Sequence, residues 1–217
     1  MNEYIAVTIS RQMGSGGTYI GYKVAKELGF TYVDREILRQ AAKRLGRDES
    51  LLEECEEKSS SRIDNIIKAF SWGAPELTTY IPKGRPVYDR DLFETESTII
   101  TDIADRCDAV IIGRAGFYVL KNRPQAVHIL IHAPKEVRVN RVMKASSITD
   151  VREARTKIDE SDQRRAKFIR DMARTEWVDA RNYHLCIDSS VAGLSASVQM
   201  IVRLVEKRHL EREAQSS

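Results

Sequence analysis

Short apolar runs alternate with amphipathic segments along most of the chain. The runs are rich in β-branched residues, which predicts buried strands. Between them, apolar residues recur at a spacing of three or four, which predicts helices. The predicted strands cover residues 4–9, 31–33, 109–112, 127–131 and 185–187. The predicted helices cover residues 18–28, 37–45, 63–70, 94–106, 137–143, 150–174 and 194–205.

This alternation of short buried strands with helices predicts an α/β fold, in which a parallel sheet is covered by helices on both faces. One stretch, residues 47–93, interrupts the pattern. It contains an acidic run at 49–57 and several glycines and prolines between 73 and 86. We interpret it as a lobe inserted between core elements, not as a linker. The chain is therefore expected to form a single domain.

The composition fits a soluble globular protein. Of the 217 residues, 42% are hydrophobic and 31% are charged, with a net charge of +3. The isoelectric point near 8.7 is modest, and basic residues do not interleave with aromatic ones, which disfavours a nucleic-acid-binding module. No apolar run approaches the roughly 18 residues of a membrane span, and the N-terminal run lacks the features of a secretory leader. We expect a cytoplasmic protein with no nucleic-acid or membrane partner, while a homo-oligomer stays open.

The three cysteines are far apart in the sequence. An odd number without a C-x-x-C pair favours neither a zinc site nor a disulfide framework. Cys107 and Cys186 lie at or in predicted strands, so we expect buried thiols there.

A glycine turn joins the first predicted strand to the first predicted helix. It consists of Gly14, Ser15, Gly16, Gly17 and Thr18. Glycines allow positive φ and a close approach of the backbone to a ligand, and the N-terminus of a helix attracts anions. A flexible turn that merely connects two elements is the alternative. The position directly after the first strand favours the binding of a nucleotide's phosphates.

This glycine turn fits the P-loop pattern G-x-x-x-x-G-K-[ST] in part. With Thr18 in the last position and Gly16 at the second glycine, Gly17 replaces the lysine and Arg11 replaces the first glycine. Thr18 is then expected to bind Mg²⁺ through its hydroxyl. Because the lysine normally neutralises the transferring phosphates, our hypothesis is that Arg11 supplies that charge as a catalytic cation. The alternative is an Arg11 that pairs with a surface carboxylate.

Two further polar residues fall at the ends of predicted strands. Asp34 follows the strand at 31–33, and Arg114 follows the strand at 109–112. Ligands of open parallel sheets bind beyond the carboxyl ends of the strands, so both residues are expected near the glycine turn. Asp34 has a simpler alternative role as the cap of a helix that begins near residue 35, worth about 1 kcal/mol.

Longer segments around these residues resemble the cytidylate kinase-like family, a branch of the P-loop nucleoside monophosphate kinases. The most specific part of the resemblance is ISRQMGSGG at 9–17 combined with YVDREIL at 32–38. Weaker matches are AVIIGRAGFYVL, VHILIHAPKEVRVNRV, IDESDQRRAKFIRDM and NYHLCIDSS. The matches cover most of residues 4–205, and 47–93 is the weakest part.

The resemblance implies a P-loop NTPase-like, doubly wound sheet of five parallel strands flanked by helices. It also implies that residues 47–93 form a helical lobe over the acceptor nucleotide and that a mobile lid lies at about 145–175. The implied reaction is transfer of the γ-phosphoryl of ATP, with Mg²⁺, to CMP or a related small monophosphate.

Individual residues acquire roles from the same resemblance. Asp34 and Arg114 match acceptor-side positions, and Asp162 and Arg165 match the lid aspartate and the catalytic arginine that holds the transferring phosphate. Arg164, beside it, is expected to add another substrate-binding cation. The alternative for the lid arginines is a solvated or salt-bridged helix face.

The chain departs from the kinases of that family at four polar positions. Gly17 replaces the loop lysine, Ile112 and Ala115 replace two aspartates, and Ile158 replaces a lid arginine. These departures support an alternative function, that of a nucleotide-binding regulator which keeps the fold but transfers no phosphoryl group. The identity of the acceptor depends on pocket shape in residues 47–93 and stays open.

Overall fold

The computed structural model describes residues 4–35, 38 and 90–216. Within them, five parallel strands form one sheet in the order β2-β3-β1-β4-β5. The strands are β1 (Ala6–Arg11), β2 (Thr31–Val33), β3 (Ala109–Ile112), β4 (Ala126–His132) and β5 (Leu185–Asp188). The predicted α/β class is confirmed, and all five predicted strands are present with bounds that differ by about two residues or less.

Helices connect the strands and continue beyond them. They are α1 (Gly17–Leu28), α4 (Arg90–Arg106), α5 (Gly116–Val119), α6 (Lys135–Ser146), α7 (Val151–Ala173) and α8 (Leu194–Ser216), with a 3₁₀ turn η2 (Ala180–Asn182). The last helix continues well past its predicted end at residue 205. The helices predicted at 37–45 and 63–70, and the inserted lobe up to residue 89, lie outside the described residues.

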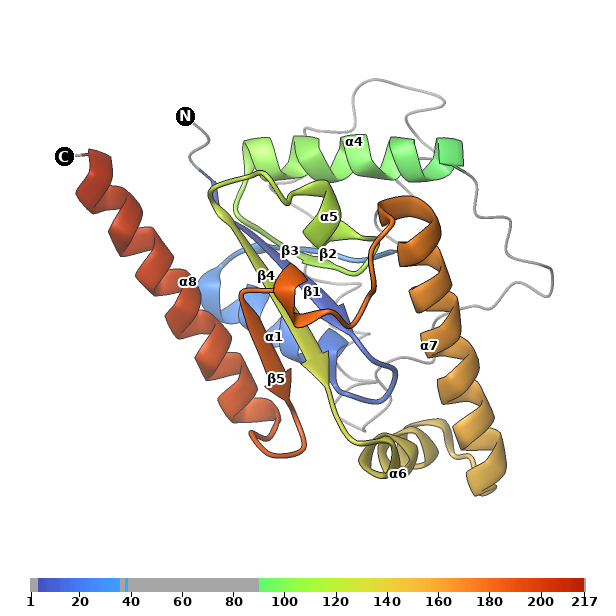
Figure 1. Cartoon of the computed structure of the whole chain (residues 1–217). Helices are drawn as coiled ribbons and strands as arrows, with labels where there is room; N and C mark the ends of the chain where they lie inside the picture. Colours follow the sequence, from blue (N-terminus) through green and yellow to red (C-terminus); the bar gives the residue numbers. More distant parts are fainter. Residues whose placement is uncertain (1–3, 36–37, 39–89, 217) are drawn as a thin grey trace.

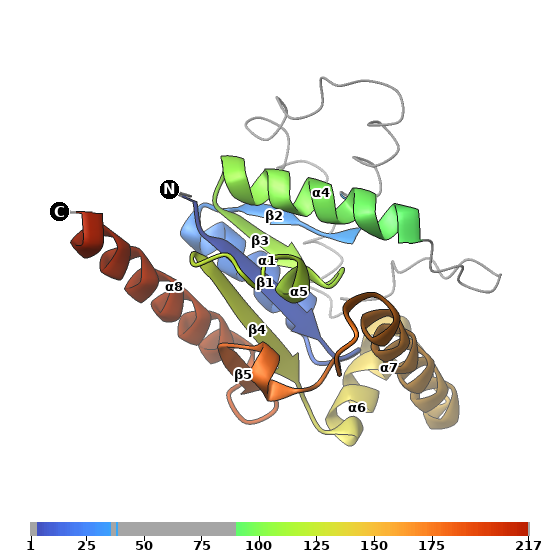
Figure 2. The same cartoon turned by 45° about the horizontal axis from the view of Figure 1, so that its top comes forward.

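Alternate side chains of the strands face different layers of helix. On one face, Val7 and Ile9 belong to a buried cluster with α1 and α8. On the other face, Ile111 packs with α4, while Leu130 packs in a cluster with Phe168 of α7. Figures 1 and 2 show the sheet between these layers. Both faces are therefore covered, as expected for a parallel sheet.

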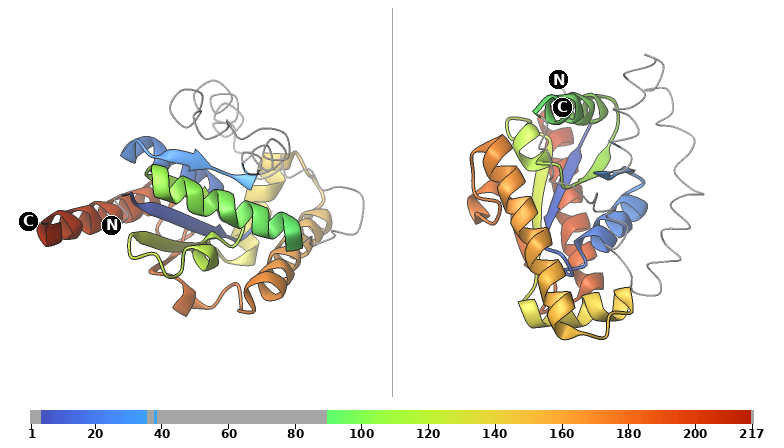
Figure 3. Two further views of the ribbon diagram at one scale, coloured as in Figure 1. Left: turned by 90° about the horizontal axis from the view of Figure 1, so that it is seen from above. Right: turned by 90° about the vertical axis from the view of Figure 1, so that its right-hand side faces the viewer.

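The helices α6 and α7 form a hairpin beyond the carboxyl ends of β1 and β4 (Figure 1). They pack against each other through a small buried cluster that includes Val139, Val142, Ala154 and Ile158. In Figure 3 this hairpin lies at the opposite end of the molecule from the N- and C-termini. It therefore stands next to the loop that follows β1, where the glycine turn lies.

The edge strand β5 corrects one expectation about the cysteines. Cys186 is exposed and Cys107 is only half-buried, whereas Ile187 is buried. Successive side chains of a strand point to opposite faces, and an edge position leaves one of them in solvent. The expected buried thiol is wrong for Cys186, and Cys55 lies outside the described residues. Over the described part of the chain, no helix combines the length and apolar character needed to cross a membrane.

Candidate nucleotide-binding site

The glycine turn has the backbone geometry of an anion-binding loop. Gly14 and Gly16 have φ of 79° and 80°, values that side chains with a Cβ rarely adopt. The amide of Ser15 donates to the Gln12 carbonyl at 3.2 Å, and the first helical bond of α1 runs from Ile20 N–H to the Gly16 carbonyl at 2.9 Å. The amides of the first residues of α1 therefore have no intrahelical acceptor and offer donors to an anion.

Close packing fixes the path of this turn. A Cβ on Gly14 would lie 2.8 Å from the Arg138 carbonyl oxygen, and one on Gly16 would lie 2.6 Å from Leu194 Cδ2. The turn is thus held against α6 on one side and the start of α8 on the other. Ser15 is fully buried, and its hydroxyl has no hydrogen-bond partner among the described residues. The Ser15 side chain is therefore enclosed by the packing of the turn and does not face solvent in this structure.

Arg11 lies across the start of α1. A Cβ on Gly17 would overlap Arg11 Cβ and come within 3.2 Å of Ile131 Cβ. A Cβ on Gly113 would overlap Arg11 Nη1, and Arg11 Nε lies 3.4 Å from the Thr18 hydroxyl oxygen. The arginine stem therefore fills the space where a side chain at position 17 would begin. Its guanidinium lies between the first turn of α1 and the end of β3.

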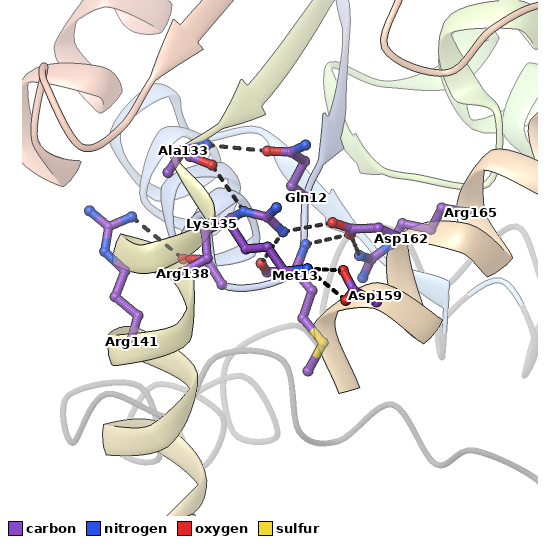
Figure 4. A network of polar contacts seen from close by, with 10 residues as sticks. Gln12, Met13, Ala133, Lys135, Arg138, Arg141, Asp159, Asp162 and Arg165 are labelled. Atoms are coloured by element: carbon purple, nitrogen blue, oxygen red, sulfur yellow. Dashed lines mark hydrogen bonds and ion pairs between the residues drawn. The ribbon is translucent and has the colours of Figure 1, made fainter. Parts of the chain in front are cut away.

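Asp162 ties α7 to the residues that lead into the glycine turn (Figure 4). Its Oδ1 accepts from the Met13 amide at 3.0 Å, and its Oδ2 accepts from Arg138 Nη1 at 2.6 Å. Arg165 Nη1 lies 3.2 Å from the same carboxylate, and its guanidinium stands 6.0 Å from the Trp177 ring. The structure thus brings Asp162 and Arg165 together beside the loop, while their roles toward a substrate stay predictions.

Two arginines of α6, which the sequence analysis did not single out, bind carbonyl groups of the loop. Arg138 is buried and donates to the Met13 carbonyl at 3.1 Å and the Ala133 carbonyl at 2.9 Å. Arg141 donates to the Ser15 carbonyl at 3.2 Å and to the Ser189 hydroxyl at 2.9 Å. Guanidinium groups of α6 therefore hold the Met13 and Ser15 carbonyls and help to fix the path of the loop.

The spacing of these two arginines was a usable signal. Positions 138 and 141 are three apart and so share one face of α6. The Ser15 carbonyl that Arg141 contacts also accepts from the Ser189 hydroxyl at 2.6 Å. Burial lowers the pKa of Arg141, against an opposing effect of the Asp188 carboxylate. The charge stays on the guanidinium at neutral pH, because an arginine pKa lies far above it.

Arg114 follows β3, at the position that the resemblance assigns to the acceptor side. Its Nε donates to Glu96 Oε2 at 2.7 Å, and its Nη2 contacts the same oxygen. The guanidinium also lies 4.5 Å from the centre of the Phe168 ring on α7. Glu96, on α4, is only 2% exposed. A buried carboxylate therefore accompanies Arg114 even though the expected flanking aspartates are replaced.

Glu96 was missed by the sequence analysis, although the pattern contained a signal. It lies on the apolar face of α4, at helical spacing from Phe93, Ile99 and Ile103, which are all buried. A lone acidic residue within an apolar stripe predicts a buried partner of opposite charge. Arg114 has φ of 49°, so its backbone conformation is also uncommon for a residue with a side chain.

The remaining predicted residues have local contacts. The Asp34 carbonyl accepts from the Leu38 amide at 3.0 Å, which supports the alternative in which Asp34 begins a helical turn after β2. Arg164 pairs with Glu160 one turn earlier on α7 at 3.4 Å. This contact supports the alternative of a salt-bridged helix face for Arg164, while its part in substrate binding stays a prediction.

The fold and the glycine turn together define a P-loop kinase-like α/β protein. The chain belongs to the cytidylate kinase-like family, whose model matches residues 6–191. The resemblance predicted from the sequence is confirmed.

Relatives and solved structures agree with this assignment. The chain is similar to a cytidylate kinase of Pyrococcus abyssi, with 29% identity over 86% of this chain and 85% of the relative. A cytidylate kinase of Pyrococcus furiosus is also 29% identical, over 86% of this chain and 80% of the relative. An uncharacterized protein from Eubacterium ventriosum shares the fold with a TM-score of 0.68, at 19% identity over 93% of this chain and 98% of its own. A gluconokinase from Sinorhizobium meliloti has a TM-score of 0.51, at 12% identity over 97% and 99% of the two chains.

Proposed function

We propose that this chain is a phosphotransferase that binds ATP at the glycine turn and moves the γ-phosphoryl to a nucleoside monophosphate or a related small acceptor. The observation that carries the proposal is the fit between Arg11 and Gly17: position 17 has no side chain, and the stem of Arg11 occupies the volume that a side chain there would need. The arginine stem lies where a lysine side chain would begin, and its Nε approaches the Thr18 hydroxyl. A cation therefore stands beside the turn although the lysine is absent.

The residues of the turn fit the phosphates of ATP. The positive φ of Gly14 and Gly16 allows the backbone to approach a phosphate closely at the start of α1. Among the described residues no group of three or more His, Cys, Asp or Glu could hold a metal ion. Mg²⁺ would therefore rest on Thr18 and on the nucleotide's own oxygens, as is usual for kinases. It would neutralise charge on the transferring phosphoryl group.

Different residues would then act on the transferring phosphoryl group and on the acceptor. Arg11 and Arg165 would stabilise charge on the equatorial oxygens, which is the main work of a phosphoryl-transfer site. Arg114, oriented by Glu96, would bind the acceptor's phosphate. Asp162 would connect substrate binding on α7 to the loop, since it already bonds the Met13 amide.

Asp34 and Arg164 are proposed as further acceptor contacts, and the residues at 47–93 as the lobe over the acceptor. The position of Asp34 after β2 supports this, since β2 lies beside β3 in the sheet. We further propose that the protein acts in the cytoplasm. The free thiols of Cys107 and Cys186 are consistent with a reducing compartment.

A second function, a nucleotide-binding regulator without phosphoryl transfer, is favoured by a specific observation. Ile158, at the position of a lid arginine in related kinases, is fully buried in the cluster between α6 and α7. Because isoleucine carries no charge, this position cannot provide the cation that the lid arginine provides in those kinases. In addition, Arg165 is occupied by the Asp162 carboxylate and must exchange this partner to hold a phosphate.

The experiment that separates the two functions is a screen for ADP formation. The purified chain is mixed with ATP and Mg²⁺ and with each nucleoside monophosphate in turn, while binding is measured in parallel by calorimetry. A phosphotransferase forms ADP with at least one acceptor and far less without any. Tight ATP binding without turnover on any acceptor would favour the regulator, and absence of ATP binding would contradict both functions.

A further inference from the structure

A second cationic cavity lies at the opposite end of the sheet from the glycine turn. It has a volume of about 230 Å³ and is bordered by the amino ends of β4 and β5, by the segment that follows α5 and by the last part of α8. Its titratable lining residues are Lys121, Arg123, His128, His184 and Arg208. None of the described residues that line it carries a carboxylate. Because the Asp105 carboxylate pairs with Arg123 from outside the lining, the positive charge of the cavity comes mainly from Lys121 and Arg208.

Arg123 is the most enclosed of these cations. Its side chain is 6% exposed and pairs with Asp105, and its Nη2 also reaches the Ala104 carbonyl. Its Nε, by contrast, has no hydrogen-bond partner within the described part of the chain. Burying a cation is costly, and an anion in the cavity would lower that cost through its charge.

The two histidines are held in a fixed arrangement beside it. Their rings stack with centroids 5.0 Å apart and an angle of 13° between the planes. The His128 amide donates to His184 Nδ1 at 2.9 Å, so a neutral His184 carries its proton on Nε2. His128 Nδ1 lies 2.8 Å from the Thr8 hydroxyl. Burial, and then the neighbouring His184, lower the pKa of His128 to about 4.

We propose that this cavity binds the phosphate group of a small anion, either inorganic phosphate or a small phosphate monoester. Three cations border it, Lys121 and Arg123 in the segment that follows α5 and Arg208 on α8, and such a set suits a group of up to two negative charges. Its volume falls below the roughly 300 Å³ at which ordinary pockets for larger ligands begin. The cavity therefore fits a phosphate with few attached atoms better than it fits a nucleotide.

This site is separate from the nucleotide site but shares a helix with it. Leu194, the first residue of α8, packs beside Gly16 of the glycine turn. Arg208 lines the cavity fourteen residues later, a rise of about 21 Å along the helix. Binding at the two places can therefore be measured independently.

The test is a titration of the full chain with inorganic phosphate, followed through the imidazole nitrogen signals of His128 and His184 by NMR. Ionic strength is kept constant with chloride. The expected result is a saturable shift of both signals, which persists in Arg11→Ala because that change affects only the glycine turn. Arg208→Gln and Lys121→Gln should each weaken the apparent affinity by about tenfold.

Lys207→Gln is the matched control, because Lys207 lies on the same helix, is exposed and pairs with Glu211. It should leave the phosphate affinity unchanged. A parallel titration with glycerol phosphate distinguishes inorganic phosphate from a small phosphate monoester as the ligand. Tighter binding of glycerol phosphate identifies a monoester, whereas equal binding of the two shows that the phosphate group alone is recognised. Shifts that do not saturate, or that are the same in Arg208→Gln as in the unaltered chain, would overturn the proposal.

Discussion

The two flanks of the glycine turn are built on different principles. On the α7 flank, charge fixes the structure, since the Asp162 carboxylate accepts from the Met13 amide and pairs with Arg138 and Arg165. On the β3 flank, packing fixes it, since the Arg11 stem lies where a Cβ at position 17 would stand and the Arg11 guanidinium lies where a Cβ at position 113 would stand. The α7 flank should be destabilised when a charge is removed, and the β3 flank should be destabilised when side-chain atoms are added at the glycines.

This difference bears on function. The cations of the α7 flank already have carboxylate partners, so they must exchange those partners to hold a phosphate. The position of Arg11, in contrast, is set by the absence of side chains at two glycines. We therefore expect the β3 flank to be disturbed mainly by added side-chain atoms, and the cations of the α7 flank to act on a phosphate only when substrate competes for the arginines.

The largest expected effect is that of Asp162→Asn. The change leaves the buried Arg138 without its carboxylate, and breaking a buried ion pair in this way costs about 3–5 kcal/mol. Because the Arg138 side chain is 8% exposed and that of Asp162 is 18% exposed, the lower end of that range is expected. Chemical denaturation followed by circular dichroism measures the loss. An unchanged midpoint would contradict the view that charge holds this flank.

Gly17→Ala should have the next largest effect. Its methyl group would overlap Arg11 Cβ, and overpacking of this kind typically costs about 1–3 kcal/mol. ATP affinity should fall, while Arg11→Gly in the same chain should recover stability because it empties the contested space. The pair of changes forms a double-mutant cycle, and strictly additive effects would show that the two positions do not compete. Gly17 is not among the glycines with positive φ, so the effect is expected from atomic overlap and not from backbone strain.

A smaller effect is expected for Glu96→Gln, on the acceptor side. Arg114 keeps its contact with the Phe168 ring but loses the carboxylate that orients it. The acceptor KM should rise by about tenfold, equivalent to about 1.4 kcal/mol, with a smaller change in kcat. Steady-state kinetics with varied acceptor measures this. A change in the KM for ATP alone would contradict a role of Glu96 in binding the acceptor.

The smallest expected effect is that of Arg164→Gln. Its described ion pair with Glu160 spans 3.4 Å on a partly exposed helix face, and such pairs contribute about 0–1 kcal/mol. Stability should therefore hardly change. A drop in turnover without a drop in stability would instead support the substrate-binding role predicted from the resemblance.

Much of the fold could be predicted because the sheet leaves a strong imprint on the sequence. Central strands such as β1 are buried on both faces and read as apolar runs, and the connecting helices carry regular stripes. The prediction of a buried Cys186 thiol in the edge strand β5 was wrong, because a run of apolar neighbours does not reveal which face of a strand is covered. The end of α8 was missed because its last turns carry few apolar residues.

The candidate site was only partly predictable. The glycine turn and Arg11 were found because their spacing after the first strand has a direct physical meaning. Glu96, Arg138 and Arg141 were missed because each acts through contacts with residues distant in sequence. Arg138, for example, binds the Met13 carbonyl. The spacing of two arginines on one face of a helix signals a shared role but does not name such a distant partner.

The central claim is that Arg11 replaces the absent lysine. The most direct measurement is the calorimetric affinity for ATP with Mg²⁺ in three chains: the unaltered one, Arg11→Ala, and the double variant Arg11→Gly with Gly17→Lys, which rebuilds the common P-loop pattern. We predict that Arg11→Ala loses about a hundredfold in affinity, about 2.7 kcal/mol. The double variant should recover most of that loss. Near-normal ATP affinity and turnover in Arg11→Ala would contradict the claim.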